Sequence, residues 1–235
     1  MPIVGNWQMK DYAPIPTGLV AHYRFVEEQS AGDDPPPAHT QEYALGVEAT
    51  PNTTTSALSA TSPFWRCFDF NGTNFYVDCN QTFESTFQDK FSIAIWFNAD
   101  DGQPSSDSVL FGSHYISSPA LNEHWVELRL STDGRLSFDY TAVTSVSAYN
   151  QFKGSTQFTD GVATGWHHVV AVMDHTISGA GGLKIYLDGT LETAYLTNTG
   201  DLGSQTPSNY SGLQNPYIGV LRYRPQGGPA SVTSY

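Results

Sequence analysis

Short strand-like segments separated by turn signals run through this chain, and this pattern limits its fold more than any other feature. Asn71-Gly72, Asp133-Gly134 and Asp188-Gly189 are hairpin-turn signals, and each lies between apolar or alternating segments. No segment carries the apolar periodicity of an amphipathic helix of three turns. Many short strands joined by turns predict an all-β protein with the architecture of a sandwich or jelly roll.

The expected strands cover much of the chain after residue 17. Residues 91–98 (FSIAIWFN) are apolar on both faces, which is typical of a central strand covered on both sides. Residues 125–131 alternate instead, with three aliphatic side chains on one face and Glu127 and Arg129 on the other. The expected strands and hairpins span residues 18–27, 68–78, 91–98, 125–131, 135–140, 166–174, 183–187, 191–195 and 217–223.

Residues 1–17 are predicted to form an extended N-terminal arm. Pro2, Pro14 and Pro16 prevent regular strand pairing and favour extended structure. Trp7 and Tyr12 give this arm aromatic anchors without a local core. The sequence leaves open whether the arm docks on its own domain or on a neighbouring subunit.

Charge and hydropathy exclude two classes of partner. The chain has 23 Asp and Glu residues against 10 Lys and Arg residues, a formal net charge of −13, so we expect neither nucleic-acid binding nor binding to an anionic membrane surface. No apolar run approaches membrane-spanning length, and residues 1–16 lack the apolar region of a signal peptide. Only 14% of residues are charged, whereas Ser, Thr, Asn and Gly are abundant. Such surfaces are frequent among extracellular and virion β-proteins, and we expect an extracellular or virion-surface location.

Cys67 and Cys79 flank the segment Phe68–Asp78, which is predicted to form a hairpin. A three-residue loop at Gly72–Asn74 would place the two cysteines opposite each other for a disulfide, whereas other loop lengths would not. The alternative is a pair of small, half-buried apolar side chains. The sequence leaves both the disulfide and the redox compartment open.

The order of the segments resembles that of a known family. The stretches in question are GLVAHYRF, FDFNGTNFYVD, FSIAIWFNAD, STDGRLSF, GWHHVVAVMD, LKIYLDGTLETA and YIGV, within residues 18–224. Their order and rough spacing are similar to those of the laminin-G-like, concanavalin A-like lectin jelly-roll domain. The resemblance implies a two-sheet antiparallel jelly-roll sandwich with one concave sheet. It also implies structural roles for most matching residues, and Trp96 and Trp166 are expected to fill the core between the sheets.

One departure from the family pattern lies near the C-terminal end. Such domains usually close with a strand of the form Gly-x-Ile-Asp-Glu-Val-x-Ile-Tyr, and residues 225–235 (PQGGPASVTSY) do not match it. The predicted domain over residues 18–235 would then lack its closing strand and expose an unpaired edge. Three explanations stay open: a longer parent protein, a strand donated by a neighbouring subunit, or cover by the N-terminal arm.

No catalytic machinery is predicted. The glucanase branch of the fold places the pattern Glu-x-Asp-x-x-Glu on one strand, and this pattern is absent. Acidic neighbours such as Glu27-Glu28 and Asp33-Asp34 lie in expected loops. Neither a Gly-x-Ser-x-Gly elbow nor a phosphate-binding loop occurs. We therefore expect the chain not to be an enzyme.

Two kinds of ligand site are expected instead. Many members of the resembling family hold a calcium ion at a loop, which makes calcium a candidate cofactor; the loop carboxylates available to it are Asp100, Asp101, Asp107 and Asp201. Glycan sites usually combine an aromatic platform with amide and carboxylate groups. The candidate residues for such a platform are Tyr115, Trp125, Tyr140, Tyr149, Asn150 and Phe152. The alternative is that these aromatic residues belong to the core.

These observations predict a non-catalytic binding or structural module that recognises a glycan or a protein surface. The aromatic arm and the unclosed edge favour membership of a larger assembly, such as a virion or a cell-surface layer, with neighbouring subunits as partners. Two alternatives remain: a divergent glycoside hydrolase of the same fold, and a purely structural subunit with no soluble ligand. The hydrolase requires two carboxylates about 5 to 9.5 Å apart on the concave face.

Overall fold

The computed structural model describes most of the chain between Phe75 and Thr199 and shorter stretches on either side. Its only described helix is α1 (Glu84–Phe87), and the other regular elements are β-strands. Within this described part, no helix has the length and apolarity needed to cross a bilayer. The described residues are 18, 20–21, 23, 49–51, 58–62, 65–72, 75–88, 90–116, 123–143, 150–174, 176–177, 182–199, 215–223 and 231–233.

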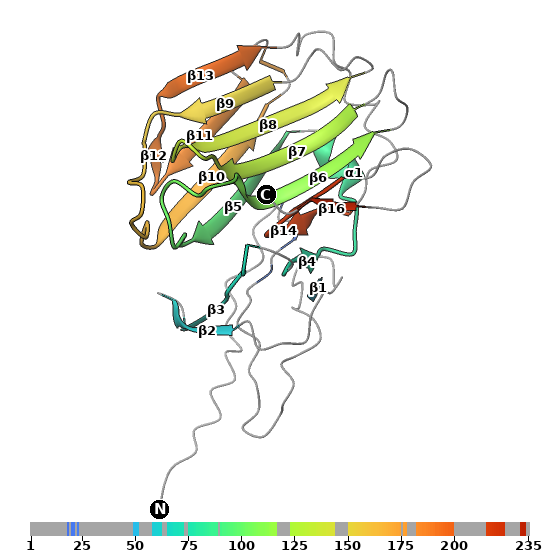
Figure 1. Cartoon of the computed structure of the whole chain (residues 1–235). Coiled ribbons are helices and arrows are strands. Elements are labelled where there is room, and N and C mark those ends of the chain that lie inside the picture. The colour runs from blue at the N-terminus through green and yellow to red at the C-terminus, as the bar shows by residue number, and fades with distance from the viewer. Residues whose placement is uncertain are drawn as a thin grey trace, which may run out of the picture.

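Two antiparallel sheets stack to form the body of the molecule, with the large sheet in front of the small one in Figure 1. This confirms the predicted all-β, two-sheet sandwich. The small sheet has the order β12 (Thr190–Leu191), β11 (Leu183–Leu187), β10 (His167–Met173) and β5 (Phe91–Phe97). The large sheet has the order β1 (Thr50–Pro51), β4 (Val77–Asp78), β14 (Tyr217–Ile218), β6 (Ser108–Ile116), β7 (Glu123–Leu130), β8 (Leu136–Val143), β9 (Asn150–Gly154) and β13 (Ala194–Thr199).

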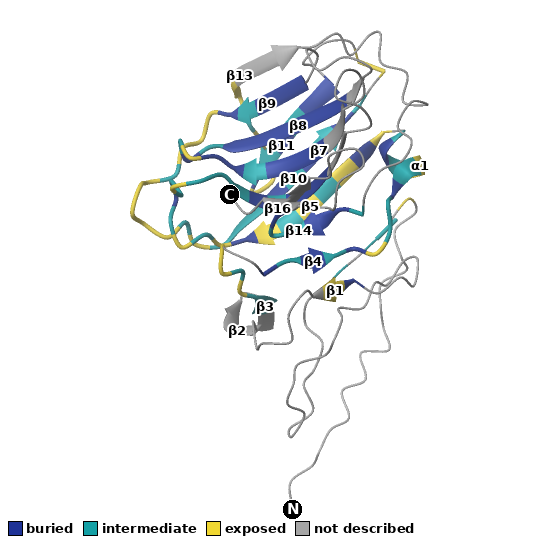
Figure 2. Ribbon diagram, turned by 45° about the vertical axis from the view of Figure 1, so that its right-hand side comes forward, coloured by how far each residue is buried: buried dark blue, intermediate teal, exposed yellow. Residues whose placement is uncertain are grey.

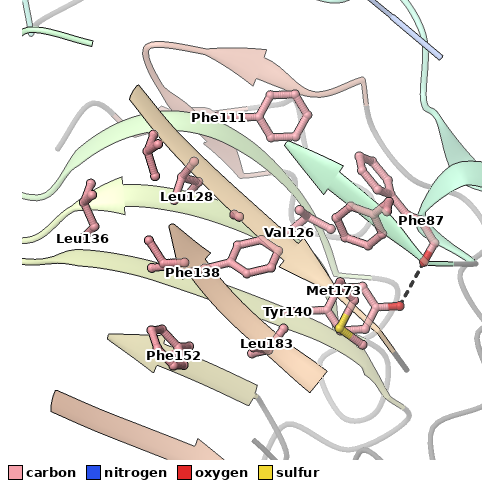
Figure 3. Close-up of a cluster of buried hydrophobic side chains, with 14 of the residues drawn as sticks. Phe87, Phe111, Val126, Leu128, Leu136, Phe138, Tyr140, Phe152, Met173 and Leu183 are labelled. Atoms are coloured by element: carbon pink, nitrogen blue, oxygen red, sulfur yellow. Dashed lines mark hydrogen bonds between the residues drawn. The ribbon is translucent and has the colours of Figure 1, made fainter. Parts of the chain in front are cut away.

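The core lies between these sheets and is built by strict alternation along each strand. Every second residue of β7, β8, β10 and β11 points into it, because side chains alternate across a strand. Figure 3 shows this cluster, with the Tyr140 hydroxyl donating a hydrogen bond of 3.0 Å to the carbonyl of Phe87. Each aliphatic or aromatic side chain buried in this way stabilises the fold by roughly 1.5–3 kcal/mol. The fully buried members include Val126, Leu128, Leu130, Phe138, Val169, Ala171, Met173, Leu183 and Ile185.

The predicted hairpin over residues 68–78 is wrong, and with it the geometry for a disulfide. The strand that holds Cys67 is β3 (Trp65–Phe68), and it pairs with β2 (Leu58–Ser62) rather than with β4. Strand β4, which precedes Cys79, pairs with β1 and β14 in the large sheet. Asn71 does form a turn, because its side chain accepts the backbone N–H of Phe75, but no ladder follows. Cys67 therefore lies in the two-stranded sheet of β2 and β3, whereas Cys79 directly follows β4 of the large sheet, and the two are not joined to each other.

Trp96 does not fill the core, contrary to expectation. Phe91 and Phe97 at the two ends of β5 are buried, so alternation turns Trp96 to the outside, where it is 46% exposed. Ser92 and Ala94 are exposed on the same side, so β5 is not covered on both faces. In the described part of the small sheet, β5 pairs only with β10 and lies at the end of the sheet. Trp166 is half-buried.

The C-terminal region holds a strand where none was predicted. Residues 231–233 form β16, which pairs with β15 (Leu221–Tyr223) in a separate two-stranded sheet. This strand lies inside the segment that does not match the family's closing strand. Residues 1–17 lie outside the described residues, so the extended arm stays a prediction.

Candidate binding face on the large sheet

The side of the large sheet that points away from the core carries polar side chains. The backbone register pairs Glu127 with Asp139 and Arg129 with Ser137 across β7 and β8, and Asp139 with Gln151 across β8 and β9. These residues alternate with the core residues of the same strands, so they all project outward. We call this set the polar face; its members are Glu127, Arg129, Ser137, Asp139, Gln151 and Lys153.

One arginine at the centre of the polar face binds three carboxylates. The distances are 2.5 Å from Arg129 Nη1 to Glu127 Oε1, 2.8 Å from Nη2 to Asp139 Oδ2 and 3.1 Å from Nε to Asp107 Oδ2. The side chains of Glu127 and Asp139 are almost completely hidden from water, at 5% and 1% exposed. The formal charge of the group is −2, because three carboxylates face one guanidinium. Charges are buried in proteins only when they are paired and hydrogen-bonded, and this group meets the first requirement through Arg129.

Burial changes the acidity of both inner carboxylates. The pKa of Asp139 is raised to about 6, mainly because burial removes the carboxylate from water; the charge of Glu127 adds to the rise, whereas Arg129 and hydrogen bonding from Gln151 and Ser137 oppose it. Burial likewise raises the pKa of Glu127 against the effect of Arg129. Ser137 donates to Asp139 Oδ1 at 3.3 Å and accepts from the Gln151 amide at 3.1 Å, so a chain of hydrogen bonds links β8 to β9.

Towards the β9–β13 edge, the polar groups become accessible and an aromatic ring joins them. Asp133 lies 3.2 Å from the Lys153 ammonium and 3.7 Å from the Arg135 guanidinium. The guanidinium of Arg135 lies 4.0 Å from the centroid of the Tyr195 ring, a cation–π contact, and Tyr195 is 59% exposed. The Gln157 amide donates to the backbone carbonyl of Asp133 at 2.9 Å. We call these five residues the Tyr195 rim.

The loop beside the rim is fixed by a second carboxylate. Glu192 accepts the backbone N–H of Thr156 at 2.8 Å and its hydroxyl at 2.7 Å. Gly154 lies so close to Glu192 that a Cβ at this position would come within 2.8 Å of the carboxylate. The segment around residues 154–157 is therefore tied to the turn after β12, which holds the rim residues in place.

The structure separates the six predicted platform residues. Tyr140 and Phe152 belong to the core between the sheets, and Asn150 is fully buried on the same side of β9. These three are therefore unavailable as an exposed platform, and for Tyr140 and Phe152 the alternative of a core role is the correct one, because alternation along β8 and β9 turns them inward. Tyr115 lies on β6 and Trp125 on β7, where only the backbone is described. Tyr149 lies outside the described residues.

Two of the four predicted calcium ligands, Asp101 and Asp107, have other partners. Asp101 Oδ1 accepts the backbone N–H groups of Gln103 at 2.8 Å and Gly161 at 2.9 Å. Asp107 accepts the N–H of Thr132 in addition to its pair with Arg129. Asp100 is exposed, and Asp201 lies outside the described residues. Among the side chains that the structure describes, no group of three or more His, Cys, Asp or Glu residues could hold a metal ion.

Part of this face could be predicted from the sequence. Glu127 and Arg129 were recognised as outward residues of an alternating strand, but Asp139, Gln151 and Tyr195 were missed as members of a site. The alternation of polar and aromatic residues in SFDY and NQFKG was the available signal for Asp139 and Gln151. No local pattern relates Tyr195 to Arg135, because a distance of 60 positions in the chain separates them.

Comparison with known proteins places this architecture in a family. No curated protein matches the chain. A family model described as the concanavalin A-like lectin/glucanases superfamily matches residues 71–220, which is well over half of the chain and includes both main sheets except for β1. The chain therefore belongs to the concanavalin A-like lectin/glucanases superfamily, as a member of its Laminin_G_3 family.

Proposed function

We propose that this chain is a non-catalytic recognition module that binds a glycan at the Tyr195 rim. The observation that carries the proposal is a half-exposed aromatic ring in contact with Arg135, whose guanidinium also contacts Asp133 and Gln157. Sugars bind proteins by stacking an apolar ring face on an aromatic side chain and by hydrogen bonds to amides and carboxylates. The rim offers Tyr195 for the first interaction, and Asp133 and Gln157 for the second.

The contacts inside the rim favour binding without large rearrangement. The cation–π contact restrains Tyr195 before any ligand arrives, and a preorganised side chain loses less conformational entropy on binding. Asp133 is 35% exposed, so it can accept a hydroxyl while Lys153 and Arg135 balance its charge. We place this module at an extracellular or virion surface, where glycans and neighbouring proteins are both available as partners.

A glycan array followed by titration with the best ligand tests this proposal. We expect Tyr195→Ala to weaken binding at least tenfold, about 1.4 kcal/mol, whereas Tyr195→Phe keeps the ring and most of the affinity. Val162→Ala is the matched control, since Val162 is a similarly exposed side chain (52%) that is not one of the five rim residues. Unchanged affinity in Tyr195→Ala would place glycan binding elsewhere, and no binding to any glycan would favour a purely structural subunit.

A divergent glycoside hydrolase is a second candidate, and one observation favours it. Glu127 and Asp139 lie opposite each other on the outward face and bind the same guanidinium, so they are candidates for the carboxylate pair that such an enzyme needs. The raised pKa of Asp139, about 6, suits a general acid. Against this candidate, both carboxylates are hidden from solvent and a substrate would have to displace what covers them.

Release of reducing sugar from a panel of polysaccharides distinguishes the two candidates. A hydrolase requires activity in the native chain, its loss in Asp139→Asn and Glu127→Gln, and its retention in the rim variant Asp133→Asn. We expect no release above background for the native chain, because we assign the buried carboxylates to a structural ion-pair network. Activity that is lost in Asp139→Asn but kept in Asp133→Asn would show that the chain is a hydrolase and would overturn the proposal of a non-catalytic module.

We also propose that the chain binds a calcium ion. The loop carboxylates proposed as its ligands are Asp100, Asp101, Asp107 and Asp201. An ion bound with the weak affinity usual for extracellular modules would stabilise the fold by roughly 1–2 kcal/mol at millimolar calcium. The melting temperature with calcium and with a chelator measures this effect. Identical melting temperatures in both conditions would overturn the proposal that the folded protein binds calcium.

A further inference from the structure

Tyr195 projects from a β-bulge in β13, the strand at one edge of the large sheet. The register shifts between Ala194 and Leu196, so Tyr195 is the extra residue of this strand opposite β9. A bulge bends its strand and changes the direction of the side chain that it carries. The guanidinium of Arg135, 4.0 Å from the ring centroid, covers one face of the Tyr195 ring. The exposed ring therefore offers a ligand its opposite face.

The two cations of the Tyr195 rim are directed at the Asp133 carboxylate and are little exposed. The Lys153 ammonium lies 3.2 Å and the Arg135 guanidinium 3.7 Å from Asp133 Oδ2, and their side chains are 16% and 14% exposed. The side chain of Asp133 is 35% exposed. The Nε–H group of Arg135 is hidden from solvent, so a ligand does not reach it. The most accessible charged group of the rim is therefore a carboxylate.

A second carboxylate lies beside the rim, on the side of the loop that follows β9. Glu192 accepts the backbone N–H and the hydroxyl of Thr156, and the hydroxyl of Ser155 at 3.4 Å. In Figure 2, this loop leaves the dark blue strand β9 as an exposed, yellow segment. The rim and Glu192 together carry two cations and two carboxylates, in a chain with a formal net charge of −13. This region therefore has no surplus of positive charge that would attract an anionic ligand.

The hydrogen-bonding groups that the rim offers to a ligand favour a partner that both donates and accepts. The Asp133 carboxylate can only accept hydrogen bonds. The Gln157 amide donates one N–H to the backbone carbonyl of Asp133 at 2.9 Å, which leaves its second N–H for a ligand. A sugar hydroxyl both donates and accepts, whereas an ionised carboxylate or sulfate only accepts and has the same charge as Asp133. A neutral sugar therefore fits both groups, and an acidic sugar fits Gln157 but is repelled by Asp133.

We propose that the Tyr195 rim selects neutral glycans and rejects acidic ones, such as chains that present uronic acids, sialic acids or sulfated sugars. A neutral hexose stacks on the open face of Tyr195, while its hydroxyls donate to Asp133 and accept from Gln157. This inference rests on the proposed glycan binding at the rim and adds the chemical class of the ligand. The selectivity has two sources: hydrogen bonds that match a neutral sugar, and a like-charge contact that opposes an acidic one.

Titration calorimetry of the full chain with paired oligosaccharides tests this selectivity. The probes are hexasaccharides of glucose, galactose and mannose, each compared with the same hexasaccharide oxidised to the uronic acid at C6, which replaces hydroxymethyl groups with carboxylates. We expect at least one neutral form to bind, and its acidic form to bind at least tenfold more weakly at low ionic strength. The difference should shrink in about 0.5 M salt, because salt screens exposed charges.

Asp133→Asn identifies the source of the selectivity. The amide no longer repels an anion and leaves Lys153 and Arg135 without this carboxylate, so the acidic form should bind within about threefold of the neutral form. Asp174→Asn is the matched control, because it changes the net charge of the chain by the same amount at an ion pair with Lys90 that lies outside the rim. It should discriminate like the native chain, and circular dichroism should show the native fold for both variants.

Three results would overturn the inference, and they separate it from the proposed function. Equal or tighter binding of an acidic form that is lost in Tyr195→Ala would keep glycan binding at the rim but overturn its selectivity for neutral sugars. Undiminished discrimination in Asp133→Asn would show that this carboxylate is not the source of the selectivity. A lack of binding by every probe and on the glycan array would overturn the proposed function itself, and the selectivity with it.

Discussion

The outward faces of the two sheets differ in a way that their common fold does not require. The polar face of the large sheet carries carboxylates, an arginine and amides, yet Glu127 and Asp139 are hidden from water. The outward face of the small sheet carries Trp96 and Leu191, yet both are about half exposed. Solvation alone would favour the opposite arrangement, since charged groups are the costly ones to bury. The comparison teaches that a partner decides whether a charge can be buried: the carboxylates of the polar face are paired with a guanidinium of the same chain, whereas Trp96 and Leu191 stay about half exposed.

The largest effect is expected when the central cation of the polar face is removed. Arg129→Met keeps most of the side-chain volume but leaves Glu127, Asp139 and Asp107 without their counter-ion, and loss of one partner of a buried pair typically costs about 3–5 kcal/mol. Denaturant unfolding measures the change in free energy. Lys184→Met on the outward face of the small sheet is the matched control and should change the stability by less than about 0.5 kcal/mol. A loss below about 1 kcal/mol in Arg129→Met would show that the network is not a main source of stability.

A smaller effect is expected in the pH dependence of stability. The pKa of Asp139 is raised to about 6 in the folded state, above its ordinary value near 3.8, so the folded state binds more protons between these values. The contribution of Asp139 therefore reduces stability as pH rises from about 4 to 6 and stays at its full, unfavourable size above that window. Its size is on the order of 3 kcal/mol.

Asp139→Asn should flatten this part of the stability profile, because the amide does not titrate. The slopes of the native and variant profiles are compared between pH 4 and 6, and Asp133→Asn at the exposed rim serves as the control with the native slope. Comparing the slopes separates the effect of Asp139 from that of Asp188, which is present in both chains. The pKa of Asp188 is lowered: burial opposes the shift, but hydrogen bonding from His168 and His167 outweighs it. Equal slopes in Asp139→Asn and the native chain would contradict the raised pKa of Asp139.

The smallest effect on the free energy of unfolding is expected for a substitution of Trp96. Trp96→Gln should change the free energy of unfolding by no more than about 0.5 kcal/mol, because the side chain is half exposed. Phe97→Ala, one position further on the same strand, should cost about 3–5 kcal/mol, because Phe97 is buried in the core. Denaturant unfolding measures both changes. Similar losses in both variants would show that Trp96 is part of the core after all.

Much of the fold could be predicted from local patterns. The strands containing Val126, Val169 and Ile185 were expected from alternating or apolar segments, and two of the three turn signals, at Gly134 and Gly189, do connect neighbouring strands. The signal at Asn71-Gly72 failed, because a turn fixes only a few residues, whereas the pairing of β3 and β4 depends on strands from other parts of the chain. The prediction that Trp96 fills the core was wrong, because residues 91–98 are apolar on both faces and the pattern does not show which face is covered.

The sequence by itself determined the fold class and the shared face of Glu127 and Arg129, because both depend on the period of neighbouring residues. It also indicated the family, through the order and spacing of its segments. Only the tertiary structure decided that Tyr140 and Phe152 face the core, that Asp139 shares the guanidinium of Arg129 and that Tyr195 lies over Arg135. These contacts join residues on different strands, and the register that brings them together follows from the packing of two whole sheets. Local patterns fix which side chains share a face of a strand, and tertiary packing fixes which of the two faces is covered.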